Sequence, residues 1–228
     1  MKKIRKFVIL PLLFILLAAL AFSLIFVIMR GNIEIYRDTD SISDAVQSLR
    51  PSVILLENVS AIPQPDGLSC GITTVTMMSN YYHHADLEAT ALIERYDTKG
   101  NSYDDMISAL REEIPGRAVT LRTNATDEEM IRDIHASLNG SDPVMISFGS
   151  RNPYNEPYYD FHASVVYGMD LERETITIAN AYGYSEEVSL VDFLNRMSYT
   201  ETKKYPLFQQ FVLVLTNMQN KNTYFLVD

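Results

Sequence analysis

The sequence predicts an α+β fold preceded by one N-terminal transmembrane helix, and three observations support this prediction. Residues 7–29 form an apolar run that is long enough to cross a bilayer as a helix. Over most of residues 70–138, apolar side chains recur at helical spacing. Residues 144–183 instead combine β-branched and aromatic residues with turn residues, as antiparallel strands do. We therefore expect a helical half that packs on an antiparallel sheet.

The apolar run also predicts how the chain is oriented in a bacterial cell membrane. Four basic residues precede it, so the positive-inside rule keeps the N-terminus cytoplasmic and places the rest of this single-pass chain outside the cytoplasm. A cleaved signal peptide is the alternative, with Ala19-Leu20-Ala21 as its small-residue cleavage site. The run continues beyond that site to Met29, which favours an uncleaved signal anchor.

Composition divides the chain into three parts. Residues 1–30 are a basic cytoplasmic tip with the signal anchor, residues 31–50 are a stalk that becomes a short helix, and residues 51–228 are one domain. The net charge is −10, and the first thirty residues contain five basic residues and no acidic one, so the remaining 198 carry −15. This acidity argues against a nucleic acid partner.

The expected elements follow from apolar spacing and from capping and turn residues. We expect helices over residues 40–50, 70–82, 86–96, 103–113, 126–138 and 190–197. Thr126 and Glu129 have the spacing of a capping box. We expect strands over residues 53–56, 119–122, 144–148, 161–170, 175–183 and 208–215, the last of which closes the sheet, with residues 224–227 as a further candidate.

Cys70 is the only cysteine, and it lies between a turn-forming run, residues 63–67, and a helix-compatible run. The free N–H groups and dipole of a helix N-terminus favour a thiolate, so we expect a lowered thiol pKa. Exported domains tend to pair their cysteines, which makes a single free thiol a candidate nucleophile. The alternative is a small buried apolar residue. Gln64, six residues earlier, could donate a hydrogen bond to an oxyanion.

Two further residues complete a possible catalytic set. His162 begins one strand of the predicted hairpin and Asn180 ends the other, so the folded hairpin brings them together at its open end. The imidazole can act as base and acid toward Cys70. The Asn180 oxygen can hold the far ring nitrogen, as in a Cys-His-Asn triad. Gln64 and the Cys70 backbone N–H would then form the oxyanion hole.

The loop before His162 carries Tyr154, Tyr158 and Tyr159, which could line a substrate groove or merely cover the surface. His83 and His84 are adjacent, but no third ligand stands at a suitable spacing, so we interpret them as a polar helix end. We expect neither a metal nor another cofactor.

The sequence resembles the papain-like cysteine peptidase superfamily and, within it, the bacteriocin-processing (double-glycine leader) peptidase-like family. The resemblance spans roughly residues 53–215 and rests on Gln64 six residues before Cys70-Gly71, on FHASVVYGMD and on ITIANAYG. It implies a papain-like fold with Cys70 as nucleophile, His162 as base, Asn180 as the residue that orients the imidazole, and Gln64 as oxyanion donor.

The sequence departs from the family pattern at two positions. Ile72 stands where the family often has proline, and Asn180-Ala181 stands where it often has Asp-Pro. The first change has little chemical effect. The second places a neutral amide where a carboxylate would stabilise an imidazolium more strongly.

These observations predict a membrane-anchored, extracytoplasmic cysteine peptidase that hydrolyses peptide bonds in a peptide or protein substrate. Two alternatives stay open. One is a catalytically inactive, peptidase-like interaction module on the membrane, and the other is an amidase that acts on cell-wall peptide.

Overall fold

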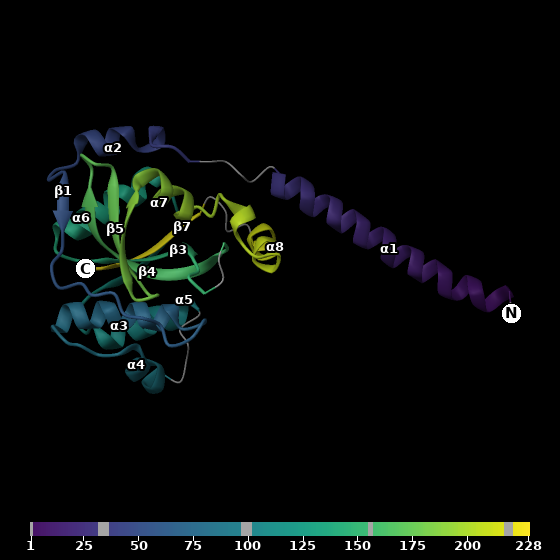
Figure 1. Cartoon of the computed structure of the whole chain (residues 1–228), viewed down its shortest axis with the longest axis horizontal. Coiled ribbons are helices and arrows are strands. Elements are labelled where there is room, and N and C mark those ends of the chain that lie inside the picture. Colours follow the sequence, from purple (N-terminus) through teal and green to yellow (C-terminus); the bar gives the residue numbers. More distant parts are fainter. Residues whose placement is uncertain (1, 32–36, 97–101, 155–156, 217–220) are drawn as a thin grey trace.

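The computed structural model describes residues 2–31, 37–96, 102–154, 157–216 and 221–228. Helix α1 (Lys2–Gly31) extends away from a body formed by the rest of the chain (Figure 1). For the side chains of α1 the described part is residues 11–27, and within the described residues no helix is both long and apolar enough to cross a membrane. Residues 32–36 of the expected stalk lie outside the described residues.

In the described residues, seven strands form one antiparallel sheet in the order β2-β7-β3-β4-β5-β6, and β1 pairs with β4 off this path. Strand β4 pairs with three other strands, β3, β5 and β1, and is therefore central in the sheet. The strands are β1 (Val53–Leu55), β2 (Val119–Ala125), β3 (Val144–Arg151), β4 (Tyr159–Asp170), β5 (Thr175–Asn180), β6 (Tyr184–Ser189) and β7 (Asn222–Val227).

Helices cover both faces of this sheet (Figure 1). One face packs against α3 (Cys70–His83), α4 (Ala89–Tyr96) and α5 (Tyr103–Glu113), and the other against α2 (Ser43–Ser48), α6 (Asp127–Asn139) and α7 (Leu190–Met197). Successive side chains of a strand point to opposite faces, so Val165 of β4 joins the α3 core and Val166 joins the α6 core. The α+β class is confirmed, but the helices form two layers rather than one half.

Local sequence signals explain most of these elements. Thr126 and Glu129 form the expected capping box at the start of α6. Ser189 caps α7 by accepting a hydrogen bond from the Asp192 N–H. Two short 3₁₀ helices, at Asp40–Ile42 and Thr202–Lys204, precede α2 and α8.

The expected strand over residues 208–215 is wrong, because α8 (Leu207–Thr216) occupies this segment. A short apolar run does not by itself distinguish a strand from a helix. The buried residues Gln210, Leu213 and Val214 have the three- and four-residue spacing of one helix face. Strand β6, which the sequence did not predict, forms the edge of the sheet beside β5.

The two layers meet the sheet so that the three candidate catalytic residues converge. Cys70 is the first residue of α3, His162 lies near the start of β4, and Asn180 is the last residue of β5. The predicted hairpin of β4 and β5 is confirmed, and its register pairs Asn180 with Ser164, two residues from His162. The open end of the hairpin therefore lies beside the N-terminus of α3.

Candidate active site

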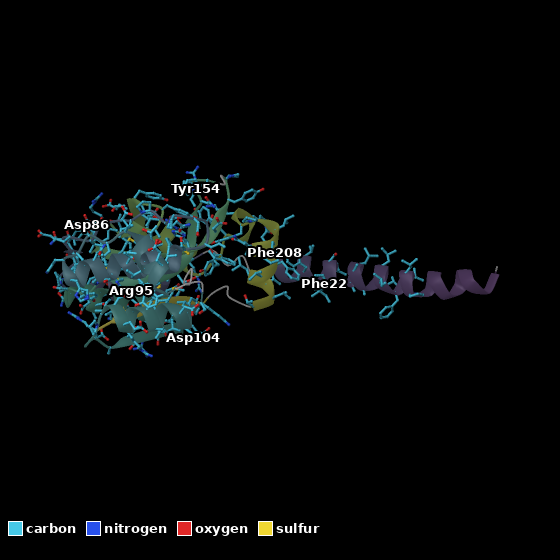
Figure 2. The ribbon with its side chains drawn as sticks, turned by 90° about the horizontal axis from the view of Figure 1, so that it is seen from below. Phe22, Asp86, Arg95, Asp104, Tyr154 and Phe208 are labelled. Carbon is cyan, nitrogen blue, oxygen red and sulfur yellow. The ribbon has the colours of Figure 1, made fainter. Side chains whose placement is uncertain are left out.

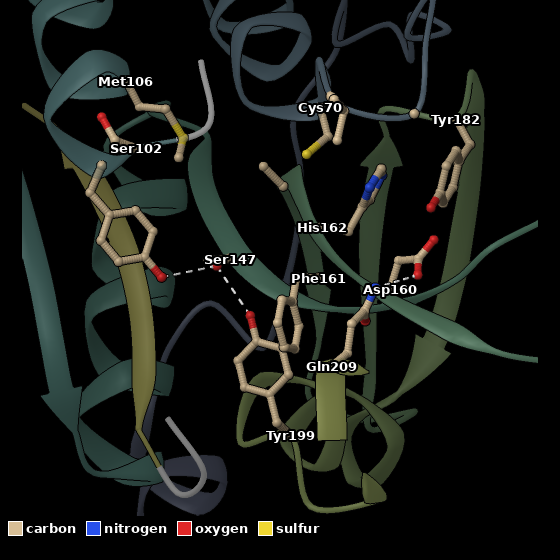
Figure 3. Close-up of a pocket in the computed structure, with 14 residues that line it drawn as sticks. Cys70, Ser102, Met106, Ser147, Asp160, Phe161, His162, Tyr182, Tyr199 and Gln209 are labelled. Atoms are coloured by element: carbon tan, nitrogen blue, oxygen red, sulfur yellow. Dashed lines mark hydrogen bonds between the residues drawn. The ribbon is translucent and has the colours of Figure 1, made fainter. Parts of the chain in front are cut away.

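Cys70 lines a cavity of about 570 Å³ between the α3 layer and the sheet. The Asp66 side chain accepts a hydrogen bond from the Leu68 N–H at 2.8 Å, which tightens the turn before the helix. Figure 3 shows Cys70 and His162 projecting into the same space. At another part of the cavity wall, the Ser147 hydroxyl is hydrogen-bonded to the hydroxyl groups of Tyr103 and Tyr199, at 3.2 and 3.1 Å.

The Asn180 side chain is fully buried and fixes the state of the His162 ring. Its Oδ1 lies 2.9 Å from His162 Nε2 and also accepts from the Tyr182 N–H at 3.0 Å. Its Nδ2 donates to Ser150 Oγ at 3.0 Å and to Glu186 Oε1 at 2.8 Å. Because a carboxylate only accepts, the amide must present its oxygen to the imidazole. His162 Nε2 therefore carries the proton, and Nδ1 is left as the basic nitrogen.

The sequence analysis missed the ion pair behind Asn180. The Arg196 guanidinium forms two hydrogen bonds with the Glu186 carboxylate, at 2.8 and 3.0 Å, and its Nε donates to the Gly149 carbonyl at 2.8 Å. Burial raises the pKa of Glu186, but Arg196 and the Asn180 amide outweigh this and lower it. Glu186 was missed because β6 was not predicted, although it follows Asn180 by only six residues.

Tyr182 is a second residue that the sequence analysis did not single out. Its ring stacks on the His162 ring with the centroids 4.0 Å apart and an interplanar angle of 13°. His162 is only 4% exposed. Burial lowers the pKa of His162 to about 3, although the hydrogen bond with Asn180 acts in the opposite direction. The imidazole is therefore neutral at physiological pH.

The thiol pKa is raised, whereas the sequence predicted that it would be lowered. Burial raises the pKa of Cys70, while the backbone N–H groups of Ala163, Gly71 and Cys70 itself lower it only in part. The favourable helix N-terminus is present, but the loss of water around the sulfur has the larger effect. The resting site therefore contains a neutral thiol and a neutral imidazole.

Gln64 is buried, but it does not line the cavity that contains Cys70. Its Nε2 donates to the Asp66 carbonyl at 2.6 Å. The side chain lines an adjoining cavity of about 430 Å³, and Gly67 and Tyr182 line both cavities. Its role as an oxyanion donor stays a prediction.

The three tyrosines of the loop before His162 lie in different surroundings. Tyr154 is exposed, lines the adjoining cavity and packs edge-on against Tyr182 with the ring centroids 6.1 Å apart. Tyr158 is exposed, and Tyr159 packs against Tyr205 with the centroids 5.9 Å apart. Neither lines these two cavities, so Tyr154 alone of the three is placed beside the site.

The two adjacent histidines end α3 as a polar pair. His83 Nε2 lies 2.6 Å from the Glu113 carbonyl oxygen, and His84 follows in the left-handed backbone region. Over the described ranges, no group of three or more His, Cys, Asp or Glu side chains is arranged to hold a metal ion.

The model of the Peptidase_C39 like family matches residues 56–207, a range that contains Gln64, Cys70, His162 and Asn180. No curated protein matches the sequence. Among solved structures, the chain is similar to the peptidase domain of Streptococcus ComA, a bifunctional ABC transporter involved in a quorum-sensing pathway. That match has 15% identity and a TM-score of 0.43, and it covers 61% of this chain and 92% of the other.

The pH dependence of Cys70 alkylation tests the neutral resting pair. The thiolate is the form that reacts, and a raised pKa keeps its fraction small at neutral pH. We expect the rate of alkylation by iodoacetamide to rise about tenfold per pH unit between about pH 6 and 8. Mass spectrometry of the detergent-solubilised chain measures this rate, because Cys70 is the only cysteine. A rate that is flat over this range indicates a preformed thiolate–imidazolium pair and contradicts the prediction.

Glu186→Gln tests whether the partly buried carboxylate supports the imidazole. The Glu186 charge raises the pKa of His162 and the Arg196 charge lowers it, so the variant leaves a weaker base. We expect cleavage of a peptide substrate to be several-fold slower at neutral pH, because a weaker base accepts the thiol proton less readily. The buried Arg196 guanidinium would lose the charge that pairs with it, which should also lower the free energy of unfolding by about 3 kcal/mol.

Glu187→Gln is the matched control for this variant. Glu187 lies next to Glu186 in β6 but forms an exposed pair with Arg173, at 2.8 Å. Its loss should change the free energy of unfolding by less than about 1 kcal/mol and leave the cleavage rate unchanged. Equal cleavage rates in the two variants would show that Glu186 does not act on the imidazole.

Proposed function

Because the chain belongs to the Peptidase_C39 like family, as its resemblance to bacteriocin-processing peptidases predicted, we propose that it is a peptidase of the cysteine type with Cys70, His162 and Asn180 as its triad. The observation that carries this proposal is the 2.9 Å contact between His162 Nε2 and Asn180 Oδ1 at the wall of the cavity that holds Cys70. It leaves His162 Nδ1 available to a thiol in that cavity. An imidazole that is held by Asn180 and lines the same cavity as a free cysteine favours catalysis over an inactive interaction module.

The reaction begins when a peptide carbonyl approaches Cys70. His162 Nδ1 takes the thiol proton as Sγ attacks the carbonyl carbon, and the imidazolium then gives this proton to the departing amine. The resulting thioester is hydrolysed by a water molecule that His162 deprotonates. Because the resting pair is neutral, His162 acts as a general base during the attack.

The oxyanion formed in this attack needs hydrogen-bond donors that are already in place. We assign the Cys70 backbone N–H, at the start of α3, and the Gln64 side chain to this role. Gln64 Nε2 carries two hydrogens, and the hydrogen bond to the Asp66 carbonyl uses one of them. The second is available to an oxyanion that extends toward the adjoining cavity.

Substitutions of the catalytic residues should have unequal effects, measured as cleavage of a peptide library by the full chain in detergent. Cys70→Ala should abolish cleavage, and His162→Ala should lose nearly as much because the base is gone. Gln64→Ala should lower turnover roughly 10²- to 10³-fold, the loss expected for one oxyanion donor, with Cys70 alkylation little changed. His84→Asn is the control, because this exposed histidine at the end of α3 has a backbone conformation that asparagine accepts.

Two results would contradict this assignment. One is a His162→Ala variant that keeps the cleavage activity of the unmodified chain. The other is a Cys70→Ala variant that preserves the biological phenotype, which would favour the interaction module.

We also propose that α1 anchors the chain in the cytoplasmic membrane with the catalytic body outside the cell. The support is in the sequence: the apolar run over residues 7–29 follows four basic residues, and the body carries the acidic charge. The substrate would then be an extracytoplasmic peptide or protein.

Protease treatment of intact bacterial cells tests this orientation. The body should be digested while a cytoplasmic reporter protein survives. Digestion of the body only after lysis would overturn the orientation. Sequencing the N-terminus of the mature chain separates the two forms of export, since a chain that starts near Phe22 has lost the anchor by signal cleavage.

A further inference from the structure

Helix α8 has an apolar surface on the side that faces away from the body. None of its ten residues is charged. Leu207, Phe208 and Leu215 are 74%, 75% and 61% exposed. Figure 2 shows Phe208 at the end of the body next to α1, away from the charged residues Asp86 and Arg95. Large apolar side chains that gather on one exposed helix face mark a site of interaction.

This surface adjoins that of α1. The Phe211 ring of α8 lies against Phe22 and Phe26 of α1, with the ring centroids 5.4 and 5.9 Å apart. Phe26 is partly buried by this contact, whereas the neighbouring side chains Leu24 and Ile25 remain exposed. The exposed apolar side chains of the two helices therefore form one surface.

The contact with α1 also sets the depth of α8 in a membrane. The apolar run ends at Met29, so Phe26 and Phe22 lie about 5 and about 10 Å below its outer end along the helix. Phe211 is held at that level by its contact with both rings. Helices that lie in the membrane interface bury their apolar face to a depth of about 5–10 Å. The two depths agree.

We infer that α8 lies in the outer leaflet of the membrane that α1 spans, with Leu207, Phe208 and Leu215 among the lipid chains. The inference rests on the proposed anchoring and adds a second lipid-contacting element to it. The occupant of this face is the bilayer, because any partner of α8 at the level of Phe211 would itself have to lie in the membrane. The lack of charge on α8 fits this position.

This placement brings the active site to the membrane surface. Gln209 of α8 lines the cavity that contains Cys70, and its Nε2 donates to Asp160 Oδ1 of β4 at 2.7 Å. One wall of the cavity is thus attached to a helix that lies in lipid. The substrates that fit this arrangement are polypeptides whose scissile bond is held close to the outer surface of the bilayer, by a membrane anchor or during export.

Single-cysteine labelling tests the lipid contact in the full chain reconstituted into phospholipid vesicles. Cys70→Ser removes the only cysteine, and Phe208→Cys, Leu215→Cys, Leu16→Cys or Tyr154→Cys is then added and labelled with an environment-sensitive fluorophore. Leu16 lies in the middle of the apolar run, and Tyr154 is 76% exposed on the body. Nitroxide-labelled lipids report contact with the bilayer, and iodide reports contact with water.

We expect positions 208 and 215 to be quenched by the lipid nitroxides, as position 16 is, and to be protected several-fold from iodide relative to position 154. If position 16 is quenched by lipid while positions 208 and 215 respond to iodide as position 154 does, this inference is wrong and the anchoring stands. If position 16 itself is open to iodide, the anchoring fails, and the placement of α8 fails with it. Agreement between positions 208 and 215 guards against local perturbation by one label.

Discussion

The buried amide of Asn180 is the constraint on which the catalytic geometry depends. Its two acceptor and two donor positions are all occupied, by groups from β3, β4, β6 and the segment after β5. Rotation of the amide by half a turn would place its oxygen against the Glu186 carboxylate, so one orientation is strongly favoured. That orientation determines which nitrogen of His162 is protonated, and hence which one can act as a base. In the proposed mechanism the ion pair of Glu186 and Arg196 acts through this amide, since neither residue lines the cavity with Cys70.

The stacked Tyr182 and the burial of His162 explain why the resting site is uncharged. An ion pair of thiolate and imidazolium needs water or fixed dipoles to stabilise both charges, and the surroundings of these two side chains provide only part of this stabilisation. The N–H groups of Ala163, Gly71 and Cys70 are aimed at the sulfur, but burial has the larger effect. A neutral site is protected from adventitious oxidation and alkylation, since the thiolate is the reactive form. In the proposed mechanism, charge then develops only as the substrate carbonyl is attacked, where the proposed oxyanion donors can stabilise it.

How far the sequence could predict the structure depended on whether the signal was local. The turn before Cys70, the capping box at Thr126 and the β4–β5 hairpin each follow from a few adjacent residues, and all three are present. The hairpin then placed His162 beside Asn180, which no single residue indicates. The thiol pKa could not be predicted, because it depends on burial by distant segments. The strand predicted over residues 208–215 was wrong for another reason. The helix found there, residues 207–216, is apolar on two faces, so no polar face reveals its helical period.

The segments on either side of the site are also joined to each other, which makes the nucleophile loop and the triad one unit. The Gln64 N–H donates to the Ala181 carbonyl at 2.7 Å, and Pro63 forms a bridge with Tyr182. Gly183 follows with φ at +89°, and a Cβ there would come within 2.9 Å of the Pro63 ring. Both the left-handed backbone and the close approach therefore require glycine at this position. A larger residue would push the Gln64 loop away from the end of β5, and the Gln64 side chain and the His162 imidazole would lose their common support.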